Sequence, residues 1–168
     1  MAVPGRSACL AAALTLLAAV ASLAGCGGGG GGETSTQLTK AEFVAKGDEI
    51  CREGDKQYAQ AQQNPPTTAA GNAALTEKLI QITNDQLSQL RALDPPRDVE
   101  PALDRYLHAR EQGVAILEQA LSAARDNDAP AYAAAQAKMA AGQVDRLRLA
   151  QAVGFSDCSR PGGTASGG

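Results

Sequence analysis

The chain has 168 residues, of which 44% are hydrophobic and 20% are charged, and its formal net charge is −3. This length suits one domain, and because Ala makes up much of the hydrophobic share, the larger apolar side chains suffice for one core and not for two. A net negative chain without clustered Lys and Arg is not expected to bind nucleic acid, since phosphate contacts need concentrated positive charge.

Residues 1–25 have the pattern of a secretory signal peptide. Arg6 supplies the positive charge, and an apolar segment rich in Ala and Leu follows at residues 8–24. This segment is at the short limit for a bilayer-spanning helix, which needs about 20 residues. We therefore expect residues 1–25 to be removed from the mature protein.

The signal ends in Leu23-Ala24-Gly25-Cys26, which resembles the bacterial lipobox. In lipoproteins with this motif the cysteine thiol takes a diacylglyceryl group, and the chain is cut just before it. The resemblance therefore implies that Cys26 is lipidated and anchors the protein at the extracytoplasmic face of the cell membrane. The alternative is an ordinary secreted protein in which Cys26 keeps a free thiol.

A glycine-rich tether is predicted between the anchor and the folded domain. Residues 26–38 include six consecutive glycines, which form a flexible coil because they have no side chains to bury. The folded domain is predicted at residues 39–158. Residues 159–168 are again rich in glycine and are predicted to be a disordered tail.

The cysteines predict one disulfide. If Cys9 leaves with the signal and Cys26 is lipidated, Cys51 and Cys158 remain as an even pair in an exported, oxidising compartment. A bridge between them would join the two ends of the domain. A redox pair or two metal ligands are the alternatives, although there is no Cys-x-x-Cys spacing and no His lies near either cysteine.

Four helices are predicted in chain order. A capping box at Thr39 and Glu42 begins the first, at residues 39–63, and two prolines follow it. The second runs from residue 67 or 72 to 93, the third from 99 or 101 to 125, and the Ala-rich fourth from 130 to 153. The third has the clearest apolar stripe, and no stretch alternates with the period of a strand.

The predicted fold is therefore all-α: an antiparallel four-helix bundle, up-down-up-down, closed by one disulfide. Short connections favour antiparallel neighbours. Such a bundle also places its first and last helices side by side, where Cys51 and Cys158 need to be. Two long helical hairpins with little core are the alternative, which would leave the leucine stripes exposed.

No group of residues predicts catalysis, a metal or a cofactor. The single histidine, His108, has Asp104 and Glu111 one turn away, but a metal site needs three or four converging ligands. Alternating charges in the first helix are typical of a salt-bridged helix surface. These charged residues are Lys46, Asp48, Glu49, Arg52, Glu53, Asp55 and Lys56.

Arg110 and Arg146 fall at or near core-facing positions of the third and fourth helices. Inward-facing arginines would have to pair with carboxylates or bind an anionic ligand. The interpretation that we favour from the sequence is that each extends along the edge of its apolar stripe toward water.

Four features occur in a fixed order: the lipobox at Cys26, Phe43 with Ile50-Cys51, residues 90–96, and residues 153–158. In this order they resemble a group of small actinobacterial lipoproteins. The resemblance implies a location and a helical fold, and it carries no active site to this chain. The function favoured by the sequence is a non-enzymatic envelope lipoprotein whose helical domain is an interaction or structural module for an unidentified envelope protein or polymer. The alternative is a ligand-binding or sensory lipoprotein with a cavity for a small anion or lipid.

Overall fold

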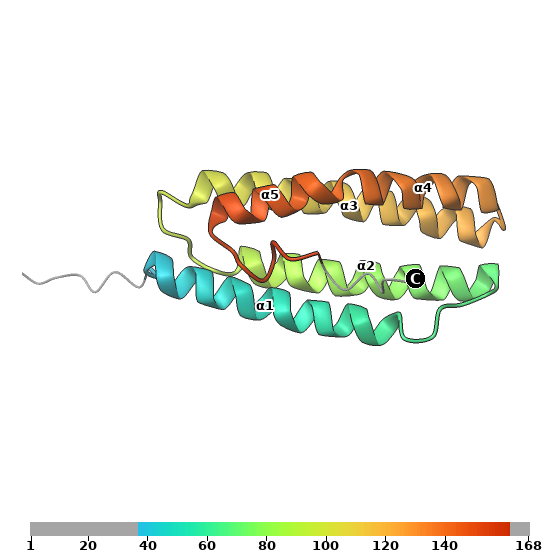
Figure 1. Ribbon diagram of the computed structural model, residues 1–168, viewed down its shortest axis with the longest axis horizontal. Helices are drawn as coiled ribbons and strands as arrows, with labels where there is room; N and C mark the ends of the chain where they lie inside the picture. The colour runs from blue at the N-terminus through green and yellow to red at the C-terminus, as the bar shows by residue number, and fades with distance from the viewer. Residues whose placement is uncertain (1–36, 162–168) are drawn as a thin grey trace, which may run out of the picture. The chain divides into compact units, whose positions relative to one another are not determined.

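The computed structural model describes residues 37–161 (Figure 1). The signal peptide, Cys26, most of the tether and the end of the tail lie outside the described residues, so those assignments stay predictions. The described residues contain helices and no strand, which confirms the all-α class. Within them, no helix is both long enough and apolar enough to span a bilayer.

The first three helices lie close to their predicted positions. They are α1 (Lys40–Ala61), α2 (Ala69–Arg91) and α3 (Glu100–Arg125). The capping box of α1 is confirmed: the Thr39 hydroxyl accepts a hydrogen bond from the Glu42 N–H, and the Glu42 carboxylate accepts one from the Thr39 N–H. These bonds satisfy two of the donors that every helix start leaves without an internal partner.

The predicted fourth helix is interrupted, so the prediction of one continuous helix at residues 130–153 is wrong. The structure has α4 (Ala129–Ala141) and α5 (Gln143–Val153), separated by Gly142. At the break, the Arg146 side chain donates a hydrogen bond to the Met139 carbonyl in the last turn of α4, at 2.8 Å. A Cβ atom at position 142 would lie 2.6 Å from Nη1 of Arg146. The glycine therefore leaves room for the side chain that satisfies the end of α4.

The helices pack on one another in sequence order. α1 packs against α2, α2 against α3, and α3 against both α4 and α5, as Figure 1 shows. By contrast, α1 does not pack extensively against α4 or α5. Direct helix packing therefore does not close the side of the domain between α1 and the α4–α5 pair.

The segment after α5 (residues 154–161, here called the C-terminal segment) fills one end of that side. Gly154 turns the chain with a φ of 104°, a left-handed conformation that suits glycine. Phe155 then enters the core, where its ring stacks on Phe43 at 5.6 Å and meets Tyr106 edge-on at 5.9 Å. A Cβ atom at position 47 would lie 2.2 Å from the Phe155 ring, so only a glycine at this position permits the ring to approach α1 so closely.

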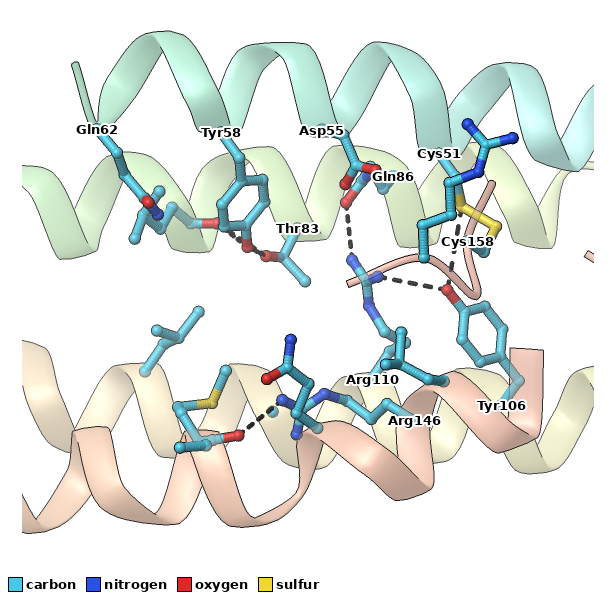
Figure 2. A pocket seen from close by; sticks show the side chains of 18 of the residues that line it. Cys51, Asp55, Tyr58, Gln62, Thr83, Gln86, Tyr106, Arg110, Arg146 and Cys158 are labelled. Atoms are coloured by element: carbon cyan, nitrogen blue, oxygen red, sulfur yellow. Dashed lines mark hydrogen bonds between the residues drawn. A yellow bond between two sulfur atoms is a disulfide. The ribbon is translucent and has the colours of Figure 1, made fainter. Parts of the chain in front are cut away.

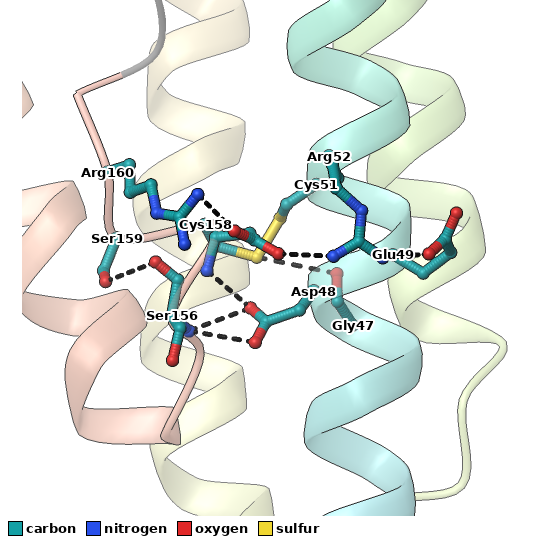
Figure 3. A network of polar contacts seen from close by, with 10 residues as sticks. Gly47, Asp48, Glu49, Cys51, Arg52, Ser156, Cys158, Ser159 and Arg160 are labelled. Atoms are coloured by element: carbon teal, nitrogen blue, oxygen red, sulfur yellow. Dashed lines mark hydrogen bonds and ion pairs between the residues drawn. A yellow bond between two sulfur atoms is a disulfide. The ribbon is translucent and has the colours of Figure 1, made fainter.

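Covalent and polar contacts hold the C-terminal segment on α1 (Figure 3). The disulfide between Cys51 and Cys158 is present, as the sequence predicted. Next to it, the Asp48 carboxylate accepts hydrogen bonds from the backbone N–H groups of Ser156 and Asp157, each at 2.8 Å. Asp48 is only 9% exposed. The prediction that Asp48 lies on a salt-bridged surface is therefore wrong. Its side chain points inward because the backbone N–H groups of Ser156 and Asp157 have no partner within a helix and donate to its carboxylate.

Candidate functional site

A pocket of about 360 Å³ lies on the side of the domain where α1 does not pack against α4 and α5. All five helices and the C-terminal segment contribute to its walls. The volume lies within the range of small-molecule sites in proteins, about 300 to 1,000 Å³. The disulfide lies at one end of this pocket (Figure 2).

Arg110 of α3 points into the middle of the pocket (Figure 2). Its Nη2 donates a hydrogen bond to Oε1 of Gln86 on α2 at 2.7 Å, and its Nη1 donates one to the Tyr106 hydroxyl at 3.3 Å. The guanidinium carbon also lies 6.0 Å from the centre of the Tyr106 ring, at the outer limit of a cation–π contact. All these partners are neutral, so they orient the guanidinium group without neutralising its charge.

The position of Gln86 depends on the glycine opposite it on α1. Gln86 is 4% exposed, and a Cβ atom at position 54 would lie 1.6 Å from its Nε2 atom. Gly54 therefore creates the space in which the Gln86 amide lies between α1 and α2. Because the same amide accepts a hydrogen bond from Arg110, Gly54 helps to orient the arginine.

Arg146 of α5 is the second arginine of the pocket and is half-buried. Burial lowers the pKa of Arg146, and the positive charge of Arg110 lowers that pKa further. An arginine nevertheless stays protonated at neutral pH. Two positive charges therefore share one partly desolvated pocket, in which burial is the larger cause of the lowered pKa of Arg146.

Asp55 of α1 is the one carboxylate among the residues that line the pocket. Within the described part of the chain it makes no hydrogen bond, and it is in no ion pair with either arginine at a distance of 4.0 Å or less. Burial raises the pKa of Asp55, while the nearby charge of Arg110 opposes that rise and the charge of Asp157 adds to it. The carboxylate thus faces the arginines without neutralising them by direct contact.

A third arginine at the pocket has a partner of its own. Arg160 in the C-terminal segment forms an ion pair with Asp157 at 2.9 Å, and Asp157 also pairs with Arg52 at 2.8 Å. The charges available to a ligand are therefore those of Arg110 and Arg146. Partly buried cations without a paired carboxylate are costly, and an anion that enters the pocket would relieve that cost.

The part of the pocket beyond Arg110 is mostly apolar. Leu79, Leu117, Met139 and Leu147 line the pocket. The Tyr58 hydroxyl bonds to the Thr83 hydroxyl, which itself donates to the Leu79 carbonyl at 2.8 Å. The side chains of Gln62, Gln136 and Gln143 also line the pocket, so its walls offer amide groups as well as apolar contact area.

The structure brings Arg110 and Arg146 together, although they come from different helices 36 positions apart (110 to 146). Neither side chain simply extends along the edge of its helix toward water, which was the interpretation that we favoured from the sequence. The reason is the open side of the domain, which gives both guanidinium groups a shared hollow. Whether they bind a ligand remains a proposal.

Sequence reasoning missed the role of Asp55, which it placed on a salt-bridged helix surface. That interpretation is right for Glu49 with Arg52 and for Glu53 with Lys56, which form ion pairs. It is wrong for Asp55, which lies one helical turn after Cys51. The helical period could have placed Asp55 on the inward side of α1, because Cys51 was already assigned there.

His108 lies away from the pocket. Its side chain is 70% exposed, its Nδ1 is 3.7 Å from a carboxylate oxygen of Glu111, and its Nε2 is 3.1 Å from Gln112. Among residues 37–161, no group of three or more His, Cys, Asp and Glu side chains is arranged to hold a metal ion.

Comparisons with known proteins return no relative: no protein-family model, curated protein or solved structure matches this chain.

Proposed function

We propose that this protein is a membrane-anchored lipoprotein of the cell envelope whose helical domain binds a small anionic ligand between its helices. One observation carries the ligand-binding part. Arg110 and Arg146 line the same pocket, both are half-buried, and within the described residues neither is in an ion pair with a carboxylate. An anion of small size would supply the missing partner for both.

The sequence supports the anchoring part of the proposal. The motif that ends in Cys26 and the six glycines after it suit a domain held near a membrane by a flexible tether. The disulfide supports an exported location, because disulfides persist in oxidising compartments.

The proposal includes the topology of the domain. We place α4 and α5 together as the fourth member of an antiparallel up-down-up-down bundle, in which α1 is the first. The short connections between successive helices support this order. The pocket then lies between the first and fourth members, where such a bundle would otherwise be closed.

We therefore prefer ligand binding to the function that the sequence favoured, an interaction or structural module. Within the described residues, Val144 is the one large hydrophobic side chain that is exposed, at 64%. Isolated exposed apolar residues are common and indicate no interface. The pocket, by contrast, combines enclosed volume with converging charge.

Titration calorimetry of the mature chain with inorganic phosphate, sulfate and acetate tests anion binding. Replacing both Arg110 and Arg146 by Ala is expected to abolish any binding that is found. The matched controls are Arg105→Ala on α3 and Arg148→Ala on α5, because both side chains are exposed and lie outside the pocket. Binding that survives the double replacement, or that the control replacements weaken equally, would contradict the proposal.

The anchor needs a separate experiment. Cys26→Ala is expected to abolish incorporation of a labelled fatty acid and to release the protein into the medium. Retention of the variant in the membrane fraction would show that the lipobox resemblance is misleading.

A further inference from the structure

Arg110 and Leu117 lie at different levels along α3, while the guanidinium group of Arg146 reaches toward Met139, to whose carbonyl it donates a hydrogen bond at 2.8 Å. In Figure 2, the side chains of Asp55, Gln86 and Arg110 lie between the disulfide at one end and Tyr58 with Thr83 farther along. This separation matters because a ligand of mixed character must match both parts at once. It would need its charge at the level of Arg110 and its apolar part farther from the disulfide.

The length of the apolar part follows from α3. Leu117 follows Arg110 by seven positions, and both line the pocket. With a rise of about 1.5 Å per residue, Leu117 lies about 10 Å farther along the helix axis. Gly113 lies between them and leaves the wall open, because a Cβ atom there would meet only the methyl group of Met139, at 3.9 Å. A short unbranched chain whose charged end meets Arg110 would need to span about 10 Å to reach Leu117.

The charge of the ligand head follows from the balance within the pocket. Arg110 and Arg146 contribute two positive charges and Asp55 contributes one negative charge on the opposite wall. A singly charged head can accept hydrogen bonds from the arginines and leave the site near neutrality. A doubly charged head would add repulsion with Asp55, which is stronger in a partly buried site than in water.

We infer that the pocket takes an amphiphile with one singly charged anionic head, held by Arg110 and Arg146, and a short apolar chain that extends toward Leu117 and Met139. This inference rests on the proposed function and adds to it the class of ligand and its direction in the pocket. A carboxylate carries this charge at neutral pH, whereas a phosphate monoester carries between −1.5 and −2, roughly.

Calorimetry of the full mature chain with four probes tests the inference. The probes are octanoate, acetate, octanol and octyl phosphate. Octanoate is expected to bind more tightly than acetate by at least about tenfold, since each buried methylene group is worth about fourfold. It is also expected to bind more tightly than octanol and octyl phosphate. Arg110→Ala should weaken octanoate by about ten- to hundredfold, the loss expected for hydrogen bonds to a charged group.

Replacements at position 139 test the direction of the chain. Met139→Gln puts a polar group of similar length in the pocket and should weaken octanoate by a larger factor than it weakens acetate. Met139→Leu keeps the apolar character and is expected to retain the affinity. Both variants keep the backbone carbonyl to which Arg146 donates. A loss with both replacements would contradict the chain direction.

The remaining outcomes distinguish a failure of this inference from a failure of the proposed anion binding. If octanoate binds no more tightly than acetate, while both depend on Arg110, the amphiphile is overturned and anion binding stands. If octanol binds as well as octanoate and Arg110→Ala affects neither, both are overturned, as they are if no probe binds. Tighter binding of octyl phosphate than octanoate would overturn the singly charged head.

Discussion

The disulfide should provide a large share of the stability of this domain. The perturbation is the double variant Cys51→Ala with Cys158→Ala, which removes the bridge. Cys51 is 2% exposed, and alanine replaces it with little loss of buried volume. The comparison therefore measures mainly the cross-link.

The magnitude follows from the 107 positions between the two cysteines. Closing a loop of that length restricts the unfolded chain, and the loop-entropy relation gives a stabilisation of about 5 kcal/mol at 25 °C. Domains of this size are stable by about 5 to 15 kcal/mol, so the loss would be at least a third of the total. The effect acts on the unfolded state, which becomes more expanded without the bridge.

Urea unfolding of the mature protein, followed by circular dichroism, measures the effect. The double variant should lose about 4 to 5 kcal/mol of unfolding free energy and show a steeper dependence on urea, because its unfolded chain exposes more surface. Asp48→Ala is the matched control: it keeps the bridge but removes the hydrogen bonds to the C-terminal segment. A loss below about 1 kcal/mol in the double variant, or an unchanged urea slope, would refute the loop-entropy argument.

Two further predictions concern the packing and the pocket. Gly47→Ala should lower the unfolding free energy by about 1 to 3 kcal/mol, because the new methyl group would overlap the fully buried ring of Phe155, whereas Gly113→Ala has room and should be neutral or stabilising by up to about 1 kcal/mol. Equal effects of these two replacements in urea unfolding would contradict the close approach at Gly47. Asp55→Asn should stabilise the protein at neutral pH. Burial raises the pKa of Asp55 in the folded state above its unfolded pKa of about 3.9. The ionised carboxylate therefore lowers the unfolding free energy once the pH rises above the unfolded pKa and through the folded pKa. The difference in unfolding free energy between variant and wild type should shrink as the pH falls toward 4. A difference that stays constant between pH 4 and 7 would refute this prediction.

Local signals explain why much of the helical structure could be predicted. Thr39 and Glu42 define the start of α1 through bonds within four residues, and the prolines after it prevent its continuation. Gly142 shows the limit of such reasoning. The cost of a glycine within a helix follows from the sequence, but the hydrogen bond from the Arg146 side chain to the Met139 carbonyl, which satisfies the end of α4, is a feature of the structure.

The sequence by itself determined the class of fold and the two cysteines that pair, because helical periodicity and the parity of cysteines are properties of the chain alone. Only the tertiary structure decided that Arg110, Arg146 and Asp55 share one pocket. Their convergence depends on the rotation of each helix and on which helices pack extensively on one another, and no single helix contains that information. The physical reason is that side-chain burial along α1 depends on residues far away in the sequence. Asp48 points inward and bonds to residues more than 100 positions away, and Asp55, two helical turns farther along the same face, lines the pocket that α4 and α5 also line.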